Sequence, residues 1–332
     1  MPRVRLQDIA EEMGISKSTV SLALRGSPKI PAATRARVRE TAERLGYQPD
    51  PALAAAARDR WKGTPRGKGY TLAFLADQPA DGIFVKPHLE GARAGAAALG
   101  YDLEFHAVYE YPSAQALSRI LYNRGIQGLL LCHPHGDPKL WELDWPKFAI
   151  LQVGRGSLPW QFHRVVEHST LQMQMAVDHA VESDARRIGV WLFPPRLLPG
   201  IKQQIGRARY LVAHECPEEV DLRLWVDLRK PSAEEFVRVW EEFRPEIVIT
   251  ANPEPVKWLR APGNPAAADT RVLWLDWIDK TEPGVQVNRF EAGRVGVSLL
   301  QSLLVTGGFG IPEIPMTSLI PPKWCEENRG AS

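Results

Sequence analysis

The stretch from Ile15 to Leu24, ISKSTVSLAL, concentrates short side chains that can donate hydrogen bonds. Four of its ten residues carry hydroxyl groups, which compete with the hydrogen bonds of a helix and are usually kept out of helix interiors. Val20, Ala23 and Leu24 nevertheless have the spacing of a helix with one buried stripe. The stretch therefore predicts a short helix whose outward face offers serine, threonine and lysine donors, a chemistry suited to phosphates and to the edges of bases.

Two further helices are expected around this one. A first helix over residues 7–13 has its apolar residues on one stripe and ends at Gly14, which is free to take a positive φ. Ser16 then caps the second helix, residues 17–24, so that two short helices are joined by a three-residue turn, as in a helix-turn-helix. A third helix is predicted from about Pro31 to Leu45. The predicted core of the three helices consists of Leu6, Ile9, Ala10, Met13, Val20, Ala23, Leu24, Val38, Ala42 and Leu45.

The outward face of the second helix has the composition of a surface that enters the major groove of DNA. Lys17, Ser18 and Leu22 share this face near its N-terminal half, where a recognition helix meets base edges, and Leu22 suits the methyl group of thymine. Thr19 and Ser21 flank the face and suit phosphate contacts. The alternative is a serine-capped core helix whose hydroxyl groups are merely solvated.

The charges of the chain are unevenly divided. Residues 1–68 carry 14 lysines and arginines against 7 aspartates and glutamates, a net charge of +7, and the remainder carries −5, which together give the net +2 of the chain. A basic head on a mildly acidic body indicates a polyanionic partner for the head. A head that is basic only to stay well solvated is the alternative.

Residues 4–54 resemble the DNA-binding head of the lactose-repressor (LacI-type) family of bacterial transcription regulators. The shared features are D-I-A in the first helix, the G-I-S turn, T-V-S in the second helix, T-R-x-x-V in the third and L-G-Y-x-P after it, without gaps. The resemblance implies a head over residues 1–48 that binds a pseudo-palindromic operator in double-stranded DNA as part of a homodimer. Bases are then read by Lys17, Ser18 and Leu22, and the DNA backbone is held by Ser16, Thr19, Ser21, Thr34 and Tyr47.

A hinge and linker are expected over residues 49–69. The alanine-rich segment DPALAAAARDRW is a good helix former, but a helix this short is marginal in water alone. In regulators that this chain resembles, such a hinge folds when two subunits sit on the operator, and a leucine wedges into the minor groove and kinks the duplex. Ala56 stands at the position of that leucine, and Leu53 lies one turn earlier on the same face. Either Leu53 acts as the wedge, or the hinge packs without one and bends the DNA less.

From Tyr70 onward, apolar runs alternate with helical stretches, which indicates parallel sheets in a doubly wound α/β arrangement. Six segments are interpreted as buried strands, namely YTLAFLAD, QGLLLCHP, FAILQVG, RRIGVWLF, EIVITAN and RVLWLDW. The helices expected between them are HLEGARAGAAALG, SAQALSRILYNRG, LQMQMAVDHAVES, SAEEFVRVWEEF and FEAGRVGVSLLQSLLV. The remaining length, about 260 residues, suits two such lobes.

This layout is similar to the two-lobed body of the LacI-type family, which resembles periplasmic binding proteins. The resemblance implies that the body, residues 70–332, crosses between lobes near His163, near Asn288 and near residues 316–319. The first lobe is then expected over about 70–163 and 288–316, and the second over about 164–287 and 317–332. The resemblance also implies that a small effector, a sugar, binds between the lobes and controls the affinity of the head for its operator.

Polar residues that directly follow the apolar runs are candidates for effector binding, because ligands of open parallel sheets bind beyond the carboxyl ends of the strands. These residues are Asp77, Gln78, His133, Asn252 and Asp276.

The family resemblance bears on some of these candidates and adds two more. It supports Asp276 and Asn252, although Pro253 replaces the aspartate that commonly follows the asparagine. It adds Asn288, before the last long helix, and Arg207, whose spacing to the next tyrosine is one residue short of the family pattern. Each of these side chains could instead cap a helix or satisfy a loop.

Metal-ligand residue types are gathered at Cys132, His133, His135 and Asp137. No second cluster at the spacing of a zinc site accompanies them, so neither a metal nor another cofactor is predicted. The three cysteines of the chain are widely spaced and odd in number, which favours reduced thiols over a disulfide framework.

Several classes of protein are disfavoured. There is no run of about 18 apolar residues and no apolar signal-peptide core in MPRVRLQDIAEEMG, so a cytoplasmic protein without a membrane span is expected. No G-x-S-x-G, H-E-x-x-H or paired-carboxylate constellation occurs, which argues against an enzyme and gives no catalytic residue. The prediction is a sequence-specific DNA-binding regulator, a repressor, and the alternative is a solute-binding protein without DNA function.

Overall fold

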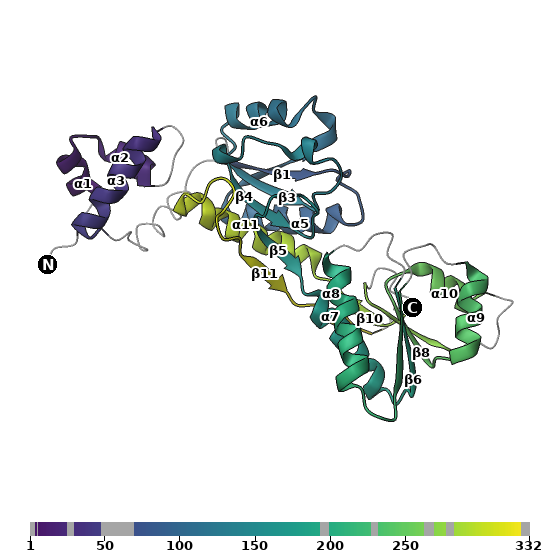
Figure 1. Cartoon of the computed structure of the whole chain (residues 1–332). Coiled ribbons are helices and arrows are strands. Elements are labelled where there is room, and N and C mark those ends of the chain that lie inside the picture. The colour runs from purple at the N-terminus through teal and green to yellow at the C-terminus, as the bar shows by residue number, and fades with distance from the viewer. Residues whose placement is uncertain are drawn as a thin grey trace. The chain divides into compact units, whose positions relative to one another are not determined.

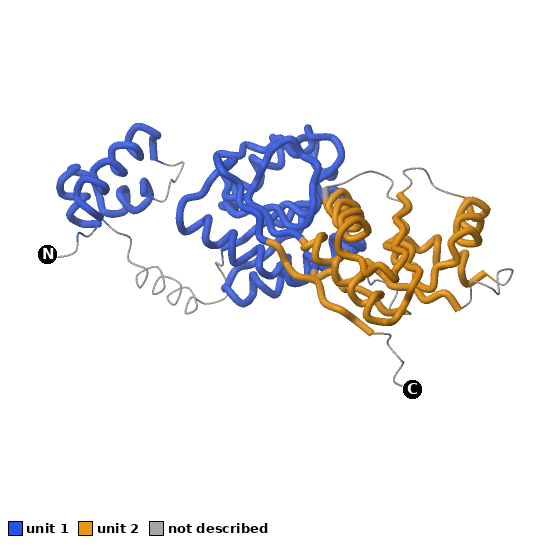
Figure 2. Tube along the Cα trace, turned by 60° about the horizontal axis from the view of Figure 1, so that its bottom comes forward, with its two compact units in different colours: residues 1–166, 289–318 blue, residues 167–288, 319–332 orange. Residues whose placement is uncertain are grey.

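The computed structural model describes residues 4, 6–24, 30–47, 70–192, 199–226, 232–261, 269–276 and 282–326. Leu53 and Ala56, predicted for the minor groove, lie outside these residues with the rest of the hinge and linker. The chain divides into two compact units, coloured blue and orange in Figure 2. Unit 1 comprises residues 1–166 and 289–318, and unit 2 comprises residues 167–288 and 319–332. The head is counted with unit 1 and is described by itself below.

Three helices form the head, drawn in purple in Figure 1. They are α1 (Leu6–Met13), α2 (Lys17–Leu24) and α3 (Ala32–Leu45). Gly14 and Gly46 end α1 and α3 with φ of +64° and +70°, a conformation that costs glycine little. The buried core is made of Ile9, Ala10, Val20, Ala23, Val38 and Ala42, against which Leu6, Met13, Ile15, Leu24, Ile30, Leu45 and Tyr47 pack. The predicted helix-turn-helix and its core are confirmed.

Unit 1 is built on a six-stranded sheet in the order β11-β5-β4-β3-β1-β2. The strands are β1 (Thr71–Ala76), β2 (Asp102–Ala107), β3 (Gly128–Cys132), β4 (Ala149–Val153), β5 (His163–Glu167) and β11 (Thr317–Ile320). The pairings β1–β2, β1–β3, β3–β4 and β4–β5 are all parallel. In this register Ala76 pairs with Cys132 and Cys132 with Val153, so β1, β3 and β4 end side by side.

Helices cover both faces of the unit 1 sheet (Figure 1). One face packs against α6 (Ala114–Asn123), and the other against α5 (Val85–Leu99) and α11 (Arg289–Thr306). Glycines let α5 and α11 approach closely: a methyl group at Gly91 would lie 1.8 Å from the carbonyl oxygen of Phe290, and one at Gly293 would lie 2.0 Å from that of His88. Backbone contact between the two helices therefore fixes the position of His88.

Unit 2 repeats this plan with a sheet in the order β12-β10-β9-β8-β6-β7. The strands are β6 (Arg187–Leu192), β7 (Asp221–Val226), β8 (Ile247–Thr250), β9 (Arg271–Trp274), β10 (Gly284–Gln286) and β12 (Lys323–Cys325). All recorded pairings are parallel except β10–β12, which is antiparallel. The helices are α7 (Ser169–Glu182), α8 (Pro199–Tyr210), α9 (Ala233–Phe243) and α10 (Pro253–Leu259), with α7 and α8 on one face and α9 and α10 on the other.

The predicted doubly wound α/β body is confirmed. The structure adds the strands β2, β5, β7, β10, β11 and β12 and the helices α8 and α10, which the apolar runs did not indicate. None of the helices in the described part of the chain combines the length and the apolar content of a membrane span.

Candidate nucleic-acid interface and ligand site

A network of hydroxyl groups caps α2. The Oγ of Ser16 accepts a hydrogen bond from the backbone N–H of Thr19 at 3.1 Å. The same oxygen lies 2.7 Å from the Oγ of Ser18 and 2.8 Å from the Oγ1 of Thr19. The cap predicted for Ser16 is confirmed, and the free backbone N–H groups of the first turn give this end of the helix a partial positive charge that attracts anions.

The two faces of α2 differ in burial as the sequence suggested. Lys17 and Ser18 are exposed and Leu22 is half-buried, whereas Val20 and Ala23 are fully buried in the head core. The first turn of α2 contains no acidic residue, so nothing in the helix itself repels a phosphate there.

The other residues predicted to contact the DNA backbone lie around this face. Thr19 and Ser21 on α2 and Thr34 in the first turn of α3 are half-buried, and Tyr47 packs against the head core. Their contacts with DNA, like those of Lys17, Ser18 and Leu22, stay predictions.

Two of the predicted effector residues meet at the carboxyl edge of the unit 1 sheet. Asp77 follows β1 and His133 follows β3, at strand ends that are in register. The Oδ2 of Asp77 accepts a hydrogen bond from the backbone N–H of His135 at 3.1 Å, which holds the loop after His133 against the end of β1. Gln78 is half-buried in the turn after Asp77.

The structure brings His88 to the same edge, although nothing in the sequence pointed to it. His88 lies on α5, is fully buried, and packs its imidazole edge-on against that of His133 with 4.9 Å between ring centroids. The Sγ of Cys132 is the third member of the group, and the candidate ligand atoms of the three side chains lie within 4.8 Å of one another.

In unit 2, Asn252 and Asp276 follow the neighbouring strands β8 and β9. A backbone hydrogen bond of 2.9 Å from Leu275 to Thr250 ties these two strand ends together, so both polar side chains belong to one edge of the sheet. Both are half-buried, and the side chain of Asn252 makes no capping bond to α10.

Two buried glutamines at this edge were missed from the sequence. The Nε2 of Gln172 on α7 donates to the carbonyl oxygen of Leu275, and the Nε2 of Gln204 on α8 donates to the Oε1 of Gln172 at 2.8 Å. The sequence could not point to these two glutamines, because only the fold shows which carbonyl oxygen a glutamine side chain on a helix will reach.

Arg207 and Asn288 bond to protein groups within unit 2. The Nε of Arg207 donates to Gln174 at 2.6 Å, and its Nη2 pairs with Glu215 at 2.6 Å. The Nδ2 of Asn288 donates to the carbonyl oxygen of Pro321 at 2.8 Å. This bond holds a loop, and a contact of Asn288 with an effector stays a prediction.

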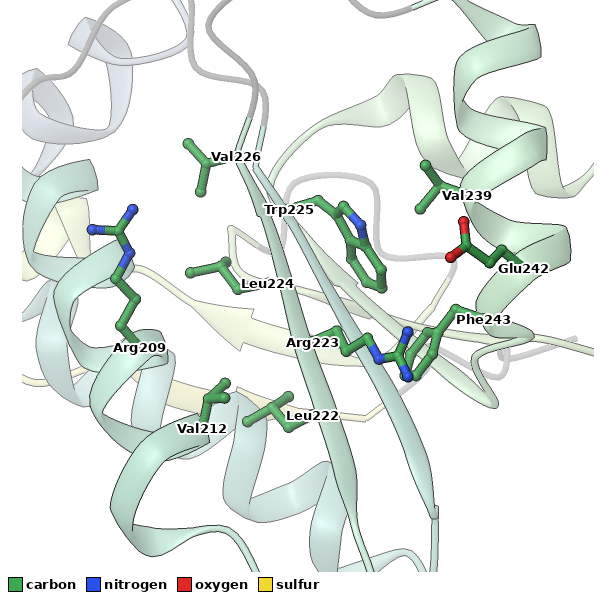
Figure 3. A pocket seen from close by; sticks show the side chains of 10 residues that line it. All are labelled: Arg209, Val212, Leu222, Arg223, Leu224, Trp225, Val226, Val239, Glu242 and Phe243. Atoms are coloured by element: carbon green, nitrogen blue, oxygen red, sulfur yellow. The ribbon is translucent and has the colours of Figure 1, made fainter.

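A pocket of about 590 Å³ runs along the edge strand β7 of unit 2. Figure 3 shows its lining on both faces of that strand, with Leu222 and Leu224 on the side of α8 and Trp225 beside α9. The pocket is thus a groove that straddles a sheet edge, and none of the seven predicted effector residues lines it.

The chain resembles known regulators in sequence and in fold. Residues 5–50 match the family of bacterial regulatory proteins, lacI family. The HTH-type transcriptional regulator AglR of Rhizobium meliloti (strain 1021) is 37% identical over 111 residues, which are 33% of this chain and 28% of AglR. The head is therefore a lacI-family helix-turn-helix domain.

Solved structures extend the likeness of fold to the body. The transcriptional regulator CelR in complex with cellobiose superposes with a TM-score of 0.54 at 19% identity, over 99% of this chain and all of that one. The lac repressor dimer bound to operator and the anti-inducer ONPF superposes with a TM-score of 0.55 at 17% identity, over 98% and 99%. The whole chain thus has the fold of LacI-type regulators, as predicted.

Proposed function

We propose that this protein is a sequence-specific DNA-binding transcription regulator, and that its affinity for an operator is controlled by a small ligand. The observation that carries the proposal is the exposed first turn of α2, where Lys17 and Ser18 project from a capped helix within a lacI-family head. Such a turn can place donors on base edges while its backbone approaches phosphates. We propose repression as its effect on transcription.

The effector is proposed to be a carbohydrate. Strand-end polar residues, Asp77 and His133 in unit 1 and Asn252 and Asp276 in unit 2, offer the carboxylate, imidazole and amide groups that bind hydroxyls. Two proteins of the same fold were solved with small ligands, CelR with cellobiose and the lac repressor with the anti-inducer ONPF. Ligand binding would change the relative placement of two heads in a homodimer, a coupling that is typically about 1–3 kcal/mol.

We propose a cytoplasmic homodimer without catalytic activity, which binds a pseudo-palindromic operator because two related heads meet two half-sites. Leu53 is the candidate for the minor-groove wedge in place of Ala56. Replacing Leu53 with alanine should reduce the bend of the bound duplex, and an unchanged bend angle would rule out the wedge.

The experiment is a selection of bound duplexes from a random pool with the full chain, followed by mobility-shift titration of the enriched sequence. We expect a pseudo-palindromic motif, with preference for it lost in Lys17→Ala. A panel of carbohydrates that includes cellobiose is then tested for thermal stabilisation and for a change in operator affinity. Enrichment of no sequence, together with stabilisation by a sugar, would instead indicate a solute-binding protein without DNA function.

A further inference from the structure

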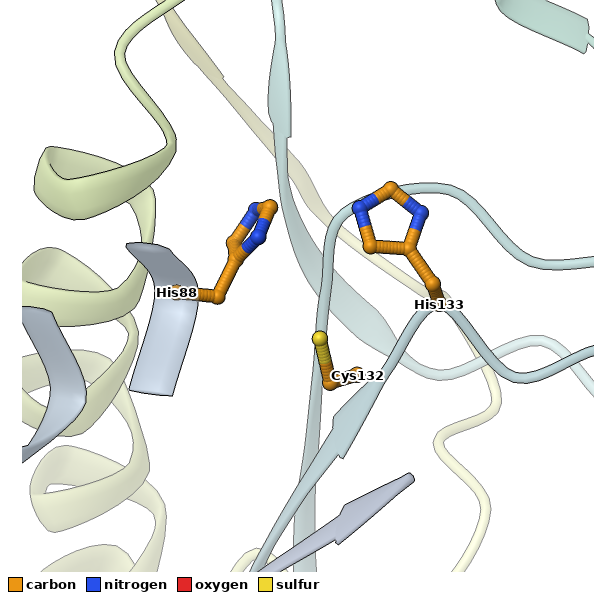
Figure 4. Close-up of side chains that lie close together, drawn as sticks. All are labelled: His88, Cys132 and His133. Carbon is orange, nitrogen blue, oxygen red and sulfur yellow. The ribbon is translucent and has the colours of Figure 1, made fainter. Parts of the chain in front are cut away.

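We propose that His88, Cys132 and His133 form a binding site in unit 1 for a divalent transition-metal ion, with Zn²⁺ as the best match. The site goes beyond the proposed regulatory function and does not rest on it, and it shares only His133 with the residues proposed to bind the effector. Figure 4 shows His88 approaching from α5, and Cys132 and His133 from the end of β3, with the Sγ of Cys132 between the two imidazole rings in this view.

The hydrogen bonding of His88 selects the tautomer that binds metal. Its Nδ1 lies 2.7 Å from the carbonyl oxygen of Phe84. A carbonyl only accepts, so Nδ1 carries the proton and Nε2 presents its lone pair. Histidines that ligate metals almost always donate their other ring N–H to a carbonyl or carboxylate in this way, which fixes the ring and raises its basicity as a ligand.

The backbone of His133 is held in place by its neighbours. Its N–H donates to the carbonyl oxygen of Val153 at 3.0 Å, and its carbonyl oxygen accepts from the Nδ1 of His135. His133 has a φ of +42°, which is uncommon for a residue other than glycine and tends to persist at functional sites. Gly154 leaves room for the imidazole, because a methyl group there would lie 2.3 Å from the Nε2 of His133.

The three ligand atoms are already close to the geometry that a metal ion requires. They lie within 4.8 Å of one another, and Cys132 is not in a disulfide. His88 and Cys132 are buried, and His133 is half-buried in the loop that follows β3. A tetrahedral zinc site with bonds of about 2.0–2.3 Å holds its ligand atoms roughly 3.3–3.7 Å apart. Because 4.8 Å is the upper limit of the present separations, the ligand atoms would have to approach one another by at most about 1.5 Å to reach this spacing.

The donor set determines the class of ion. One thiolate and two imidazoles suit Zn²⁺ and neighbouring transition metals, whereas Mg²⁺ and Ca²⁺ prefer oxygen ligands. Binding replaces the proton of the Cys132 thiol, which passes to solvent, so affinity should rise with pH. Three protein ligands leave a fourth position for water or another small donor, as in zinc sites that exchange a bound ligand.

The experiment uses the full chain, freed of metal with a chelator, in the absence of DNA and sugar. Titration with Co²⁺ should give one equivalent of a tetrahedral spectrum with a thiolate charge-transfer band, and Zn²⁺ should displace it. Cys132→Ala should abolish the charge-transfer band. His88→Gln and His133→Asn should each raise the apparent Kd for Zn²⁺ at least about 100-fold, since loss of an outer partner alone costs about 10- to 100-fold.

Matched controls separate this site from adventitious binding. Cys216→Ala removes a thiol elsewhere, and His214→Gln removes an exposed imidazole of unit 2, so both should leave the Co²⁺ spectrum unchanged. Because a core variant can fold poorly and Cys132 is too buried for a thiol reagent to reach, X-ray absorption of the Zn²⁺-loaded unmodified chain provides a second measurement, in which one sulfur and two imidazoles should surround the ion. A Co²⁺ spectrum without a thiolate band, or a Zn²⁺ coordination shell without sulfur, would overturn the proposal.

Discussion

The hydroxyl oxygen of Ser16 accepts the backbone N–H of Thr19 at 3.1 Å and so caps the helix that presents Lys17 and Ser18. The helix has only eight residues and a single buried stripe, so it has few other interactions to hold its first turn. The geometry proposed for DNA recognition therefore depends on a local hydrogen bond as well as on the head core.

Removal of that cap should weaken DNA binding. Ser16→Ala is expected to destabilise α2 by about 1 kcal/mol, because a capped backbone N–H loses its partner. Amide hydrogen exchange in α2 should accelerate and operator affinity should fall. The control is Ser113→Ala, which removes an equivalent cap from α6, where Ser113 accepts from Ala116 at 3.1 Å. If both variants changed DNA affinity equally, the cap of α2 would have no special role.

Base reading should reside in Lys17 and Ser18. Replacing either with alanine should reduce the preference for the selected duplex over a scrambled one by roughly 1–3 kcal/mol, while non-specific binding changes less. Lys202→Ala provides the control, because it removes the same charge from an exposed position on α8. Competition titrations measure the ratio of the affinities for the selected and the scrambled duplex. An equal loss of affinity for both duplexes would show that Lys17 acts only through its charge.

Two glycine-to-alanine substitutions should have opposite effects on stability. Gly91→Ala places a methyl group 1.8 Å from the carbonyl oxygen of Phe290, so α5 and α11 must separate at a cost of about 1–3 kcal/mol or more. Gly206→Ala meets nothing within 4 Å on α8 and should stabilise the chain by about 0.5–1 kcal/mol. Chemical denaturation measures both, and a neutral Gly91→Ala would contradict the close crossing of α5 and α11.

His106 should make unit 1 less stable in mild acid. Burial lowers the pKa of its imidazole below 6.5, and this outweighs the nearby carboxylate of Glu104, which raises the pKa and is itself paired with Arg124. The Nδ1 of His106 also lies 2.6 Å from the hydroxyl of Tyr111. The unfolded chain binds the proton of His106 more readily than the folded chain does. The contribution of His106 to the free energy of unfolding is therefore complete above pH 6.5 and is lost as the pH falls through its lowered pKa.

Thermal unfolding at a series of pH values tests this assignment. The unfolding midpoint of the unmodified chain should fall as the pH drops below 6.5. In His106→Gln, which cannot titrate, the fall should be shallower. An identical pH profile for the two proteins would show that His106 does not contribute.

The sequence indicated the central strands of both sheets but missed the edge strands β2, β7, β11 and β12, and also β5 and β10, which lie next to two of these edges. A strand covered on both faces is a nearly continuous apolar run, as in β3, GLLLC, whereas the edge strand β7, DLRLWV, alternates polar and apolar residues. Edge strands carry charged side chains that discourage pairing with other chains, and this removes the apolar signal. The helix α8 was missed for a related reason, since PGIKQQIGRARY contains few apolar residues.

In the candidate sites, the features set by neighbours in the chain could be predicted, and the contacts between distant segments could not. The cap at Ser16 and the turn at Gly14 follow from neighbours in the chain, so the sequence sufficed to predict them. The approach of His88 to Cys132 depends instead on the crossing of α5 and α11, and the amide pair of Gln172 and Gln204 depends on how α7 meets α8. Such contacts between distant segments appear only once the fold is known.

The most direct test of DNA recognition by α2 is the salt dependence of binding to the selected duplex. Phosphate contacts release counterions, so the logarithm of the association constant should fall linearly with the logarithm of salt concentration. We predict that Lys17→Ala makes this slope less steep by at most the contribution of about one phosphate contact. The preference for the operator over a scrambled duplex should be largely lost. Absence of binding at low salt, or an unchanged preference in Lys17→Ala, would contradict the assignment of α2 as the element that reads DNA.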